Sequence, residues 1–241
     1  MSVELLRDDA NYYGKVGRAY LSNSDVGTLL SDPQKFKQPI PDNINFAKGR
    51  YFHQLILEPT KAEGVQGVDA GTRTTKIYKD AIAERGVDFA MLTKEMKEIE
   101  HCVAVMMGNL DFYDLIRGEG NVYEEPAIGE FKGVKWKGKA DIVTPTMVLD
   151  LKTTSNLADF KYSARKYNYD SQCYIYQTLF GKPLIFLAIE KQSGALGIFR
   201  PSEDFVRRGE DKVERAMEVY SRFFGDTPSH SLTNYYVDEV L

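Results

Sequence analysis

The spacing of apolar residues predicts helices over most of the first half of the chain. Apolar side chains recur there every three or four positions, which is the period of a helix with one buried face. Serine before a first turn and proline near a last turn mark where such segments begin and end. The expected helices span residues 21–36, 45–58 and 76–117, the last with a break near Gly86. Between the second and the third, residues 59–75 are rich in Gly, Thr and charge and predict a mobile loop.

The pattern changes after Gly120, where apolar residues alternate with polar ones or form short continuous runs that predict strands. Helical spacing returns in two later segments, the first of them broken near Asn168. We expect strands over residues 121–131, 134–143, 147–153, 183–191 and 195–201, and helices over residues 156–181 and 203–224. This order predicts a single α/β (α+β) domain over residues 1–241, with a mixed central β-sheet flanked by helices. Its core runs from about residue 45 to 224, after a helical extension over residues 1–44.

The turn between the second and third strands sets their register. If the turn is centred between Pro145 and Thr146, Asp141 lies directly opposite Asp150. Side chains alternate between the two faces of a strand, and a β-bulge would change this pairing. The hairpin then has a core face of Ala140, Ile142, Leu149 and Leu151 and a polar face of Lys139, Asp141, Asp150 and Lys152.

The polar face of this hairpin brings two carboxylates together. Directly opposed side chains have Cβ atoms about 4.5–5.5 Å apart, where like charges repel each other. A divalent cation such as Mg²⁺ removes this repulsion, because it takes oxygen ligands from carboxylates, water and phosphate. Lys152 lies two residues beyond Asp150, within reach of a water or phosphate oxygen beside the metal. The alternative is a polar surface on which Asp141 and Asp150 simply pair with Lys139 and Lys152.

Two of the predicted helices carry pairs of residues at a spacing of four, which places both members on one helical face. Gly49 and His53 form the first pair, and Gln172 and Tyr176 form the second. His53 lies among apolar neighbours, so it either projects into a site or is a satisfied core residue. Gln172 and Tyr176 either support the hairpin or belong to a helix surface and the core.

Composition excludes several classes of protein. The chain has 31 Lys and Arg against 35 Asp and Glu, and the net charge of -4 disfavours a protein that coats nucleic acid without specificity. Two cysteines, Cys102 and Cys173, are too few for a four-cysteine zinc or iron–sulfur site. The sequence shows no secretion signal and no apolar run near the roughly 20 residues of a membrane span. We therefore expect a cytoplasmic protein with no membrane partner.

Basic residues gather locally in spite of the negative net charge. Two stretches flank the hairpin, and each is either a solvated face or a surface that holds phosphates. Arg73 and Lys76 are candidates to grip a terminal phosphate, with an ordinary basic loop as the alternative. The two stretches consist of Lys132, Lys135, Lys137 and Lys139, and of Lys161, Arg165 and Lys166.

Four short motifs follow one another across the predicted helix, strand, strand and helix. They are GRYFH (residues 49–53), GKAD (138–141), DLKTT (150–154) and QCYIY (172–176). With these motifs in this order, the chain resembles the PD-(D/E)xK nuclease superfamily, whose members have a restriction-endonuclease-like core. Within it, the chain is similar to phage-type exonucleases related to exodeoxyribonuclease VIII, lambda exonuclease and RecB-like nuclease domains. The resemblance covers about half of the chain, over residues 49–176.

The resemblance implies a metal site for Mg²⁺, with Mn²⁺ as an alternative. His53, Asp141 and Asp150 would contact the metal, together with the backbone carbonyl of Leu151. Lys152 would orient or activate the attacking water. Either one or two ions are compatible with these residues.

The resemblance also assigns supporting residues and shows departures from the family pattern. Gln172 and Tyr176 would support the site or the scissile phosphate. Asp150 stands where many members have Glu, and Ala140 with Asp141 replaces the Pro-Asp pair. The missing cysteines exclude an iron–sulfur cluster. The absence of a Walker motif indicates that there is no nucleotide cofactor.

The function implied by these matches is a Mg²⁺-dependent deoxyribonuclease in phage-type recombination or DNA processing, in a bacterial or phage-infected cell. We expect 5′-to-3′ degradation from the 5′ end of linear duplex DNA, leaving 5′-phosphate and 3′-hydroxyl ends. The resemblance further implies a ring-shaped homo-oligomer and a single-strand annealing protein as partner. One alternative is an endonuclease of the same fold. Another is a catalytically silent DNA-binding or assembly protein, which would have no need to keep Asp141, Asp150 and Lys152 together.

Overall fold

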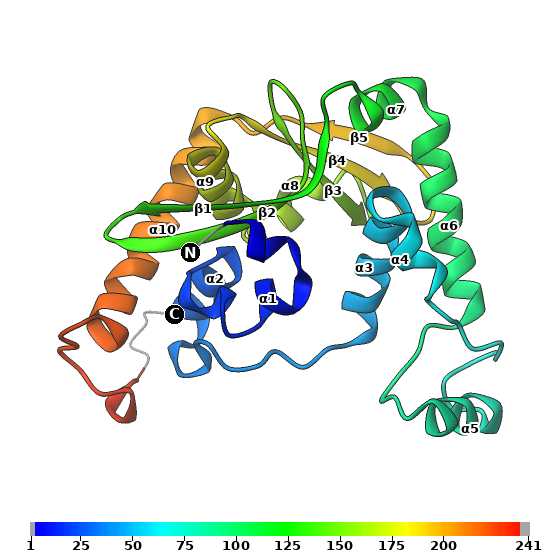
Figure 1. Ribbon diagram of the computed structural model, residues 1–241, viewed down its shortest axis with the longest axis horizontal. Coiled ribbons are helices and arrows are strands. Elements are labelled where there is room, and N and C mark those ends of the chain that lie inside the picture. Colours follow the sequence, from blue (N-terminus) through cyan, green and yellow to red (C-terminus); the bar gives the residue numbers. More distant parts are fainter. Residues whose placement is uncertain (1–2, 237–241) are drawn as a thin grey trace.

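The computed structural model describes residues 3–236, in which a central sheet lies between two layers of helices (Figure 1). Residues 1–2 and 237–241 of the predicted domain lie outside the described residues. Within the described range, no helix combines the length and the apolar composition of a membrane span.

The five strands form one mixed sheet in the order β1-β2-β3-β4-β5. Neighbouring strands are antiparallel except β3 and β4, which are parallel. The predicted fold class, a mixed central sheet flanked by helices, is therefore confirmed. The strands are β1 (Val122–Phe131), β2 (Val134–Val143), β3 (Val148–Thr154), β4 (Leu184–Glu190) and β5 (Leu196–Phe199).

Helix ends follow capping residues in the sequence. Ser22 and Asp25 form a capping box at the start of α2, and the side chain of Asn43 caps α3. Gly86 and Asn168 have φ values of 64° and 58°, so both predicted breaks are confirmed. The helices are α1 (Asp9–Tyr13), α2 (Asn23–Ser31), α3 (Ile44–Leu57), α4 (Pro59–Glu63), α5 (Lys76–Arg85), α6 (Thr93–Gly108), α7 (Leu110–Arg117), α8 (Phe160–Lys166), α9 (Tyr169–Phe180) and α10 (Glu203–Phe224).

Two segments differ from the expectation. Residues 59–75 are not a loop throughout, because Pro59 begins the short helix α4 with a φ angle already suited to a first helical turn. Residues 76–117 contain a second break at Asn109. The side chain of Asn109 accepts a hydrogen bond from Phe112 N and so starts α7 as a separate helix.

Apolar side chains of the sheet separate into two layers, because they alternate between the faces of each strand. Leu149 and Leu151 of β3 pack with α3, α6 and α7 on one face. Val148 packs with α8 and α9 on the other face. Asp150 and Lys152 alternate with the two leucines, so these polar side chains point toward the layer that contains α9.

The predicted register of the β2–β3 hairpin is confirmed next to the turn but does not extend to the aspartates. Ile142 pairs with Leu149, as expected. The ladder ends there, and no ladder pair joins Asp141 to Asp150. The two strands separate at this point and leave a gap between them. The gap places the Asp141 carboxylate against the backbone of β3 rather than opposite Asp150.

The predicted common face of Ala140 and Ile142 is wrong. Ala140 packs in the layer of α8 and α9, whereas Ile142 packs in the layer of α3 and α6. The change of face falls at Asp141, which makes no ladder pair with Glu124 opposite it in β1, and Glu124 itself has a positive φ of 48°. The regular alternation of side chains is interrupted at this distorted position.

The N-terminal segment completes the sheet where β3 leaves β2. Leu21 N donates a hydrogen bond to Lys135 O, and Leu21 O accepts one from Lys137 N, both at 2.8 Å. Backbone groups on the edge of β2 that β3 leaves uncovered therefore form hydrogen bonds with the N-terminal segment instead of with water. The extension before residue 45 is thus part of the sheet's structure.

Gly209 tests how closely α10 must approach the start of α9. A Cβ atom at residue 209 would lie 2.0 Å from the carbonyl oxygen of Asp170. We expect Gly209→Ala to lower the free energy of unfolding by about 1–3 kcal/mol, the usual cost of overpacking. Urea denaturation followed by circular dichroism measures this. Gly108→Ala is the matched control, because its Cβ would meet open space and should leave stability unchanged or slightly raised. Wild-type stability of Gly209→Ala would contradict the close approach.

Candidate functional site

The gap between β2 and β3 is closed by a histidine from α3. Leu151 N donates a hydrogen bond to Asp141 Oδ2 at 2.7 Å. His53 Nδ1 lies 3.3 Å from Asp141 Oδ1, and His53 Nε2 lies 3.0 Å from the carbonyl oxygen of Leu151. The structure therefore brings together three of the predicted site residues, including the predicted backbone carbonyl.

The charges of His53 and Asp141 in this gap shift each other's pKa. Burial disfavours a charged imidazole, but the carboxylate of Asp141 outweighs it and raises the pKa of His53 to about 9. Burial likewise acts against ionised Asp141, and the His53 charge overcomes it and lowers the pKa of Asp141. His53 and Asp141 thus form an ion pair in the metal-free protein. Binding of a metal to the imidazole requires the loss of a proton from His53.

Glu124 of β1 joins this pair, although it belongs to none of the four sequence motifs. His53, Glu124 and Asp141 each offer a ligand atom, and these atoms all lie within 4.8 Å of one another. Burial, with the charge of Asp141 adding to it, raises the pKa of Glu124 to about 7. The tight turn at Lys132 and Gly133, both with positive φ, was the missing signal. It sets a β1–β2 register in which Glu124 falls level with Asp141.

Asp150 lies deeper, with only 3% of its surface exposed. Its carboxylate forms an ion pair with Lys152 and accepts a hydrogen bond from Gln172 Nε2. Lys152 contacts Oδ2 of this carboxylate, and Gln172 contacts Oδ1. Burial raises the pKa of Asp150, and the nearby charge of Asp141 adds to this. The ammonium of Lys152 therefore supplies the positive charge that this buried carboxylate needs.

Lys152, Tyr169 and Gln172 complete the surroundings of Asp150. The Nζ atom of Lys152 lies 4.7 Å from the centre of the Tyr169 ring, a cation–π contact. Burial opposes the charge of Lys152, but Asp150 keeps its pKa above the usual value. Tyr176 does not reach the carboxylates, because its hydroxyl donates a hydrogen bond to Lys139 O at 2.9 Å. Tyr176 therefore holds β2 in place, whereas Gln172 holds Asp150.

Arg73 and Lys76 are not brought to this cluster. The guanidinium of Arg73 forms an ion pair with Glu95, which also binds Lys48 at 2.7 Å. Lys76 is exposed at the start of α5, a helix that projects away from the sheet (Figure 1). Their contact with a terminal phosphate remains a prediction.

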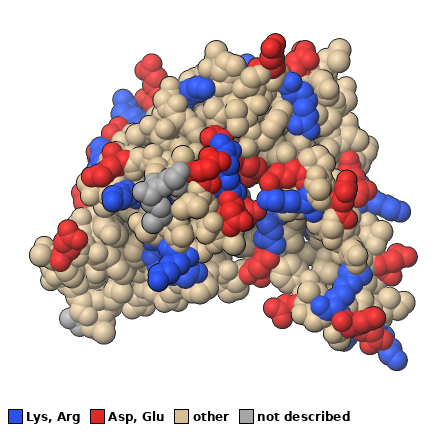
Figure 2. All heavy atoms as spheres, viewed as in Figure 1, with Lys and Arg blue, Asp and Glu red and all other residues tan. Residues whose placement is uncertain are grey.

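The basic stretch of β2 is largely used within the protein. Lys132 pairs with Glu210 and Glu214 of α10 at 2.9 and 2.6 Å. Lys139 pairs with Asp9 at 2.6 Å, and buried Lys137 donates a hydrogen bond to the backbone of α1. This stretch is therefore neither a fully solvated face nor a free phosphate surface. Figure 2 shows acidic and basic side chains interspersed over the visible face of the molecule.

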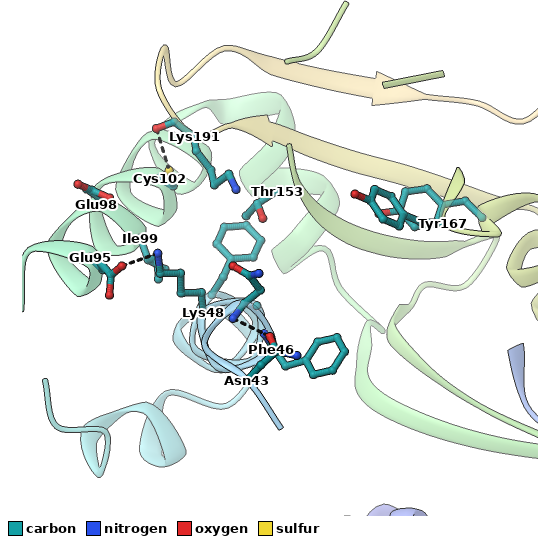
Figure 3. Close-up of a pocket in the computed structure, with 14 residues that line it drawn as sticks. Asn43, Phe46, Lys48, Glu95, Glu98, Ile99, Cys102, Thr153, Tyr167 and Lys191 are labelled. Carbon is teal, nitrogen blue, oxygen red and sulfur yellow. Dashed lines mark hydrogen bonds and ion pairs between the residues drawn. The ribbon is translucent and has the colours of Figure 1, made fainter. Parts of the chain in front are cut away.

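A groove of about 590 Å³ lies beside the cluster. Its walls come from α3, α6 and the end of β3, together with the two tyrosines that follow α8 (Figure 3). Two of the residues that line the groove place the groove next to the site. Gly49 lies one helical turn before His53, and Thr153 directly follows Lys152. A Cβ at Gly49 would meet open space, so the absence of a side chain there leaves the groove wider at this wall.

The residues of the gap fit a hard divalent cation. Asp141 and Glu124 supply carboxylate oxygens, Leu151 supplies a carbonyl oxygen, and His53 supplies one nitrogen. Asp150 pairs with Lys152 through Oδ2, and its predicted contact with the metal stays a prediction. A donor set that is mostly oxygen with one imidazole suits Mg²⁺ or Mn²⁺ better than a thiophilic metal.

Comparison with known proteins places this architecture in a wider group. The model of a family described as "PDDEXK-like domain of unknown function (DUF3799)" matches residues 31–226. A protein of Eubacterium rectale, provisionally named an exonuclease, has a similar structure. Its TM-score is 0.64 at 17% sequence identity, over 97% of this chain and 95% of that chain. A phage-related exonuclease of Haemophilus somnus has a TM-score of 0.33 at 15% identity, over 64% of this chain and 88% of that chain. No protein of curated function matches the sequence.

Metal binding tests the cluster directly. We expect wild-type protein to bind Mg²⁺ and Mn²⁺ in isothermal titration calorimetry, and Asp141→Asn to lose this binding. Glu124→Gln should weaken binding by about tenfold or more, because it removes one negative ligand. Glu125→Gln is the matched control, since the neighbouring Glu125 pairs with Arg7 outside the cluster. Unchanged affinity in Glu124→Gln would remove Glu124 from the metal site.

Proposed function

Because the chain belongs to the family of PDDEXK-like domains of unknown function, we propose that it is a metal-dependent deoxyribonuclease that hydrolyses phosphodiester bonds of DNA. The observation that carries the proposal is the arrangement of Asp141, Asp150 and Lys152 where β2 and β3 separate. A silent relative would have no need for a buried lysine and several crowded carboxylates, which are costly to bury.

Each residue of the cluster has a distinct part in the proposal. Asp141, Glu124 and Asp150 would hold Mg²⁺ with His53 and the carbonyl of Leu151. When bound, the ion supplies Lewis acidity to a phosphate oxygen and lowers the pKa of a coordinated water. These ligands also fix the position of the phosphate relative to the chain.

Lys152 and Gln172 act without contacting a metal. The ammonium of Lys152 is directed by Asp150 and Tyr169, so it can donate a hydrogen bond to an oxygen that gains negative charge during hydrolysis. Its burial strengthens this interaction, because little water competes for the ammonium. Gln172 fixes the Asp150 carboxylate and so limits the positions open to Lys152.

We further propose exonuclease action on linear duplex DNA, running from the 5′ end. The motif resemblance supports this choice, and so does the name of the structural neighbour from Eubacterium rectale. A ring-shaped homo-oligomer and a single-strand annealing partner are part of the same proposal and rest on the resemblance alone. An endonuclease of the same fold is the alternative that the substrate test separates.

Cleavage of linear duplex DNA tests the proposed activity. We expect Mg²⁺-dependent loss of a 5′-phosphorylated duplex that EDTA stops, followed by gel electrophoresis. Lys152→Ala should lower the rate by at least about a hundredfold, because it removes a preorganised positive charge. Lys135→Ala is the control, since Lys135 is an exposed lysine of β2. Its activity should equal that of the wild type.

Closed-circular DNA in parallel separates the two nuclease classes. An exonuclease leaves the circle intact, whereas cutting of the circle would replace the exonuclease proposal by the endonuclease. Folded wild-type protein that cleaves neither substrate and binds no metal would contradict the nuclease proposal as a whole.

A further inference from the structure

The outward face of α8 combines basic and aromatic side chains. Phe160 and Ala164 are buried against the sheet, which leaves the opposite face in solvent. Tyr162 is 58% exposed, and Tyr167, directly after the helix, is 56% exposed. No acidic residue interrupts the segment from residue 160 to residue 169. The exposed basic residues of this face are Lys161, Arg165 and Lys166.

These cations differ from those of β2 in their electrostatic surroundings. Lys132 and Lys139 are neutralised by carboxylates. Within residues 3–236, no carboxylate lies within ion-pair distance of the three basic side chains of α8. Lys161 and Lys166 instead lie over the rings of Tyr162 and Tyr167, at 5.0 and 5.4 Å. Their charge is therefore available to an external anion.

A row of aromatic rings connects this face with the candidate site. The ring centres of Tyr167 and Tyr169 lie 6.3 Å apart, and Tyr169 carries the Nζ atom of Lys152 over its ring. Both tyrosines line the groove beside the metal cluster. Figure 3 shows Tyr167 on the side of the groove opposite Lys48 and Phe46. The basic face thus meets the groove at Tyr167, and Glu95 and Glu98 line the groove on its α6 side.

We propose that the outward face of α8 and Tyr167 bind a single strand of DNA and guide it into the groove beside Lys152. This inference rests on the proposed nuclease function. Neighbouring cations suit a phosphate backbone, and exposed tyrosines at the same surface suit stacking with bases. In a duplex the faces of the bases are already stacked on one another, so isolated tyrosines find a partner only in an unpaired strand. The chemistry of this face therefore fits an unpaired strand rather than a duplex.

Binding without cleavage tests the proposal. The probe is a fluorescein-labelled oligothymidylate of about 12 nucleotides, within the length that a single-strand site covers. Fluorescence anisotropy in EDTA measures its dissociation constant, so that no turnover is required. Tyr167→Ala should weaken binding about tenfold, the loss expected for one stacked base, and Tyr167→Phe should restore it. Tyr113→Ala, at an exposed tyrosine of α7, is the matched control and should bind as the wild type does.

Salt dependence separates the basic residues from the tyrosine. The double substitution Lys161→Gln and Lys166→Gln should reduce the slope of log affinity against log salt concentration by about 1.4, at about 0.7 per phosphate contact. Lys79→Gln combined with Lys135→Gln removes two exposed lysines elsewhere and should leave the slope unchanged. The melting temperature of each variant is measured as well, and we expect it to equal that of the wild type because the substituted side chains are exposed.

The outcomes distinguish this inference from the nuclease proposal. Wild-type affinity of Tyr167→Ala, equal losses in Tyr113→Ala, or binding of duplex only would overturn the single-strand surface, even where DNA is still cleaved. If the protein cleaves no DNA but still binds a single strand in a way that requires Tyr167, the single-strand surface stands. The nuclease proposal is then contradicted.

Discussion

Buried carboxylates crowd the place where β2 and β3 separate, and the nearby structure is arranged around their mutual repulsion. Asp141 and Asp150 are almost completely shielded from water, and Glu124 shares their region. Like charges in such surroundings disfavour ionisation, and here burial acts in the same direction. Two cations offset the charge without metal: His53 from α3 and Lys152 from β3. The position of α3 and the departure of β3 from the β2 ladder are therefore parts of one electrostatic arrangement.

Local signals in the sequence were enough for the secondary structure and for part of the site. The turn at Pro145 gave the correct pairing of Ile142 with Leu149, because a short turn determines the register next to it. The motif positions fall together around the gap for the same reason, since each lies on an element whose start or turn is marked. Ala140 was placed on the wrong face, because the β1–β2 ladder is interrupted at Glu124 and Asp141 and regular alternation does not hold across that point. No periodicity within β2 contains that information.

Electrostatic partners were the least predictable property. Lys132 and Lys139 form one basic stretch in the sequence, but their carboxylates come from α10 and α1, at the two ends of the chain. Arg73 is likewise held by Glu95 of α6. The two residues are 22 positions apart in the sequence, too far for a local pattern to pair them. The basic residues of α8 have no such partners among the described residues 3–236, so only the three-dimensional arrangement separates neutralised cations from available ones. Charge patterns alone therefore cannot rank surfaces for binding.

The left-handed backbone at Glu124 has a consequence for the stability of this protein. A non-glycine residue with φ of 48° inside a strand costs about 1–3 kcal/mol relative to regular geometry. A strand that relaxed at this residue would fold more favourably, but it would turn the carboxylate away from Asp141 and His53. The distortion therefore replaces regular strand geometry by a position of Glu124 within 4.8 Å of Asp141 and His53. Local frustration in β1 thus marks the site independently of any sequence motif.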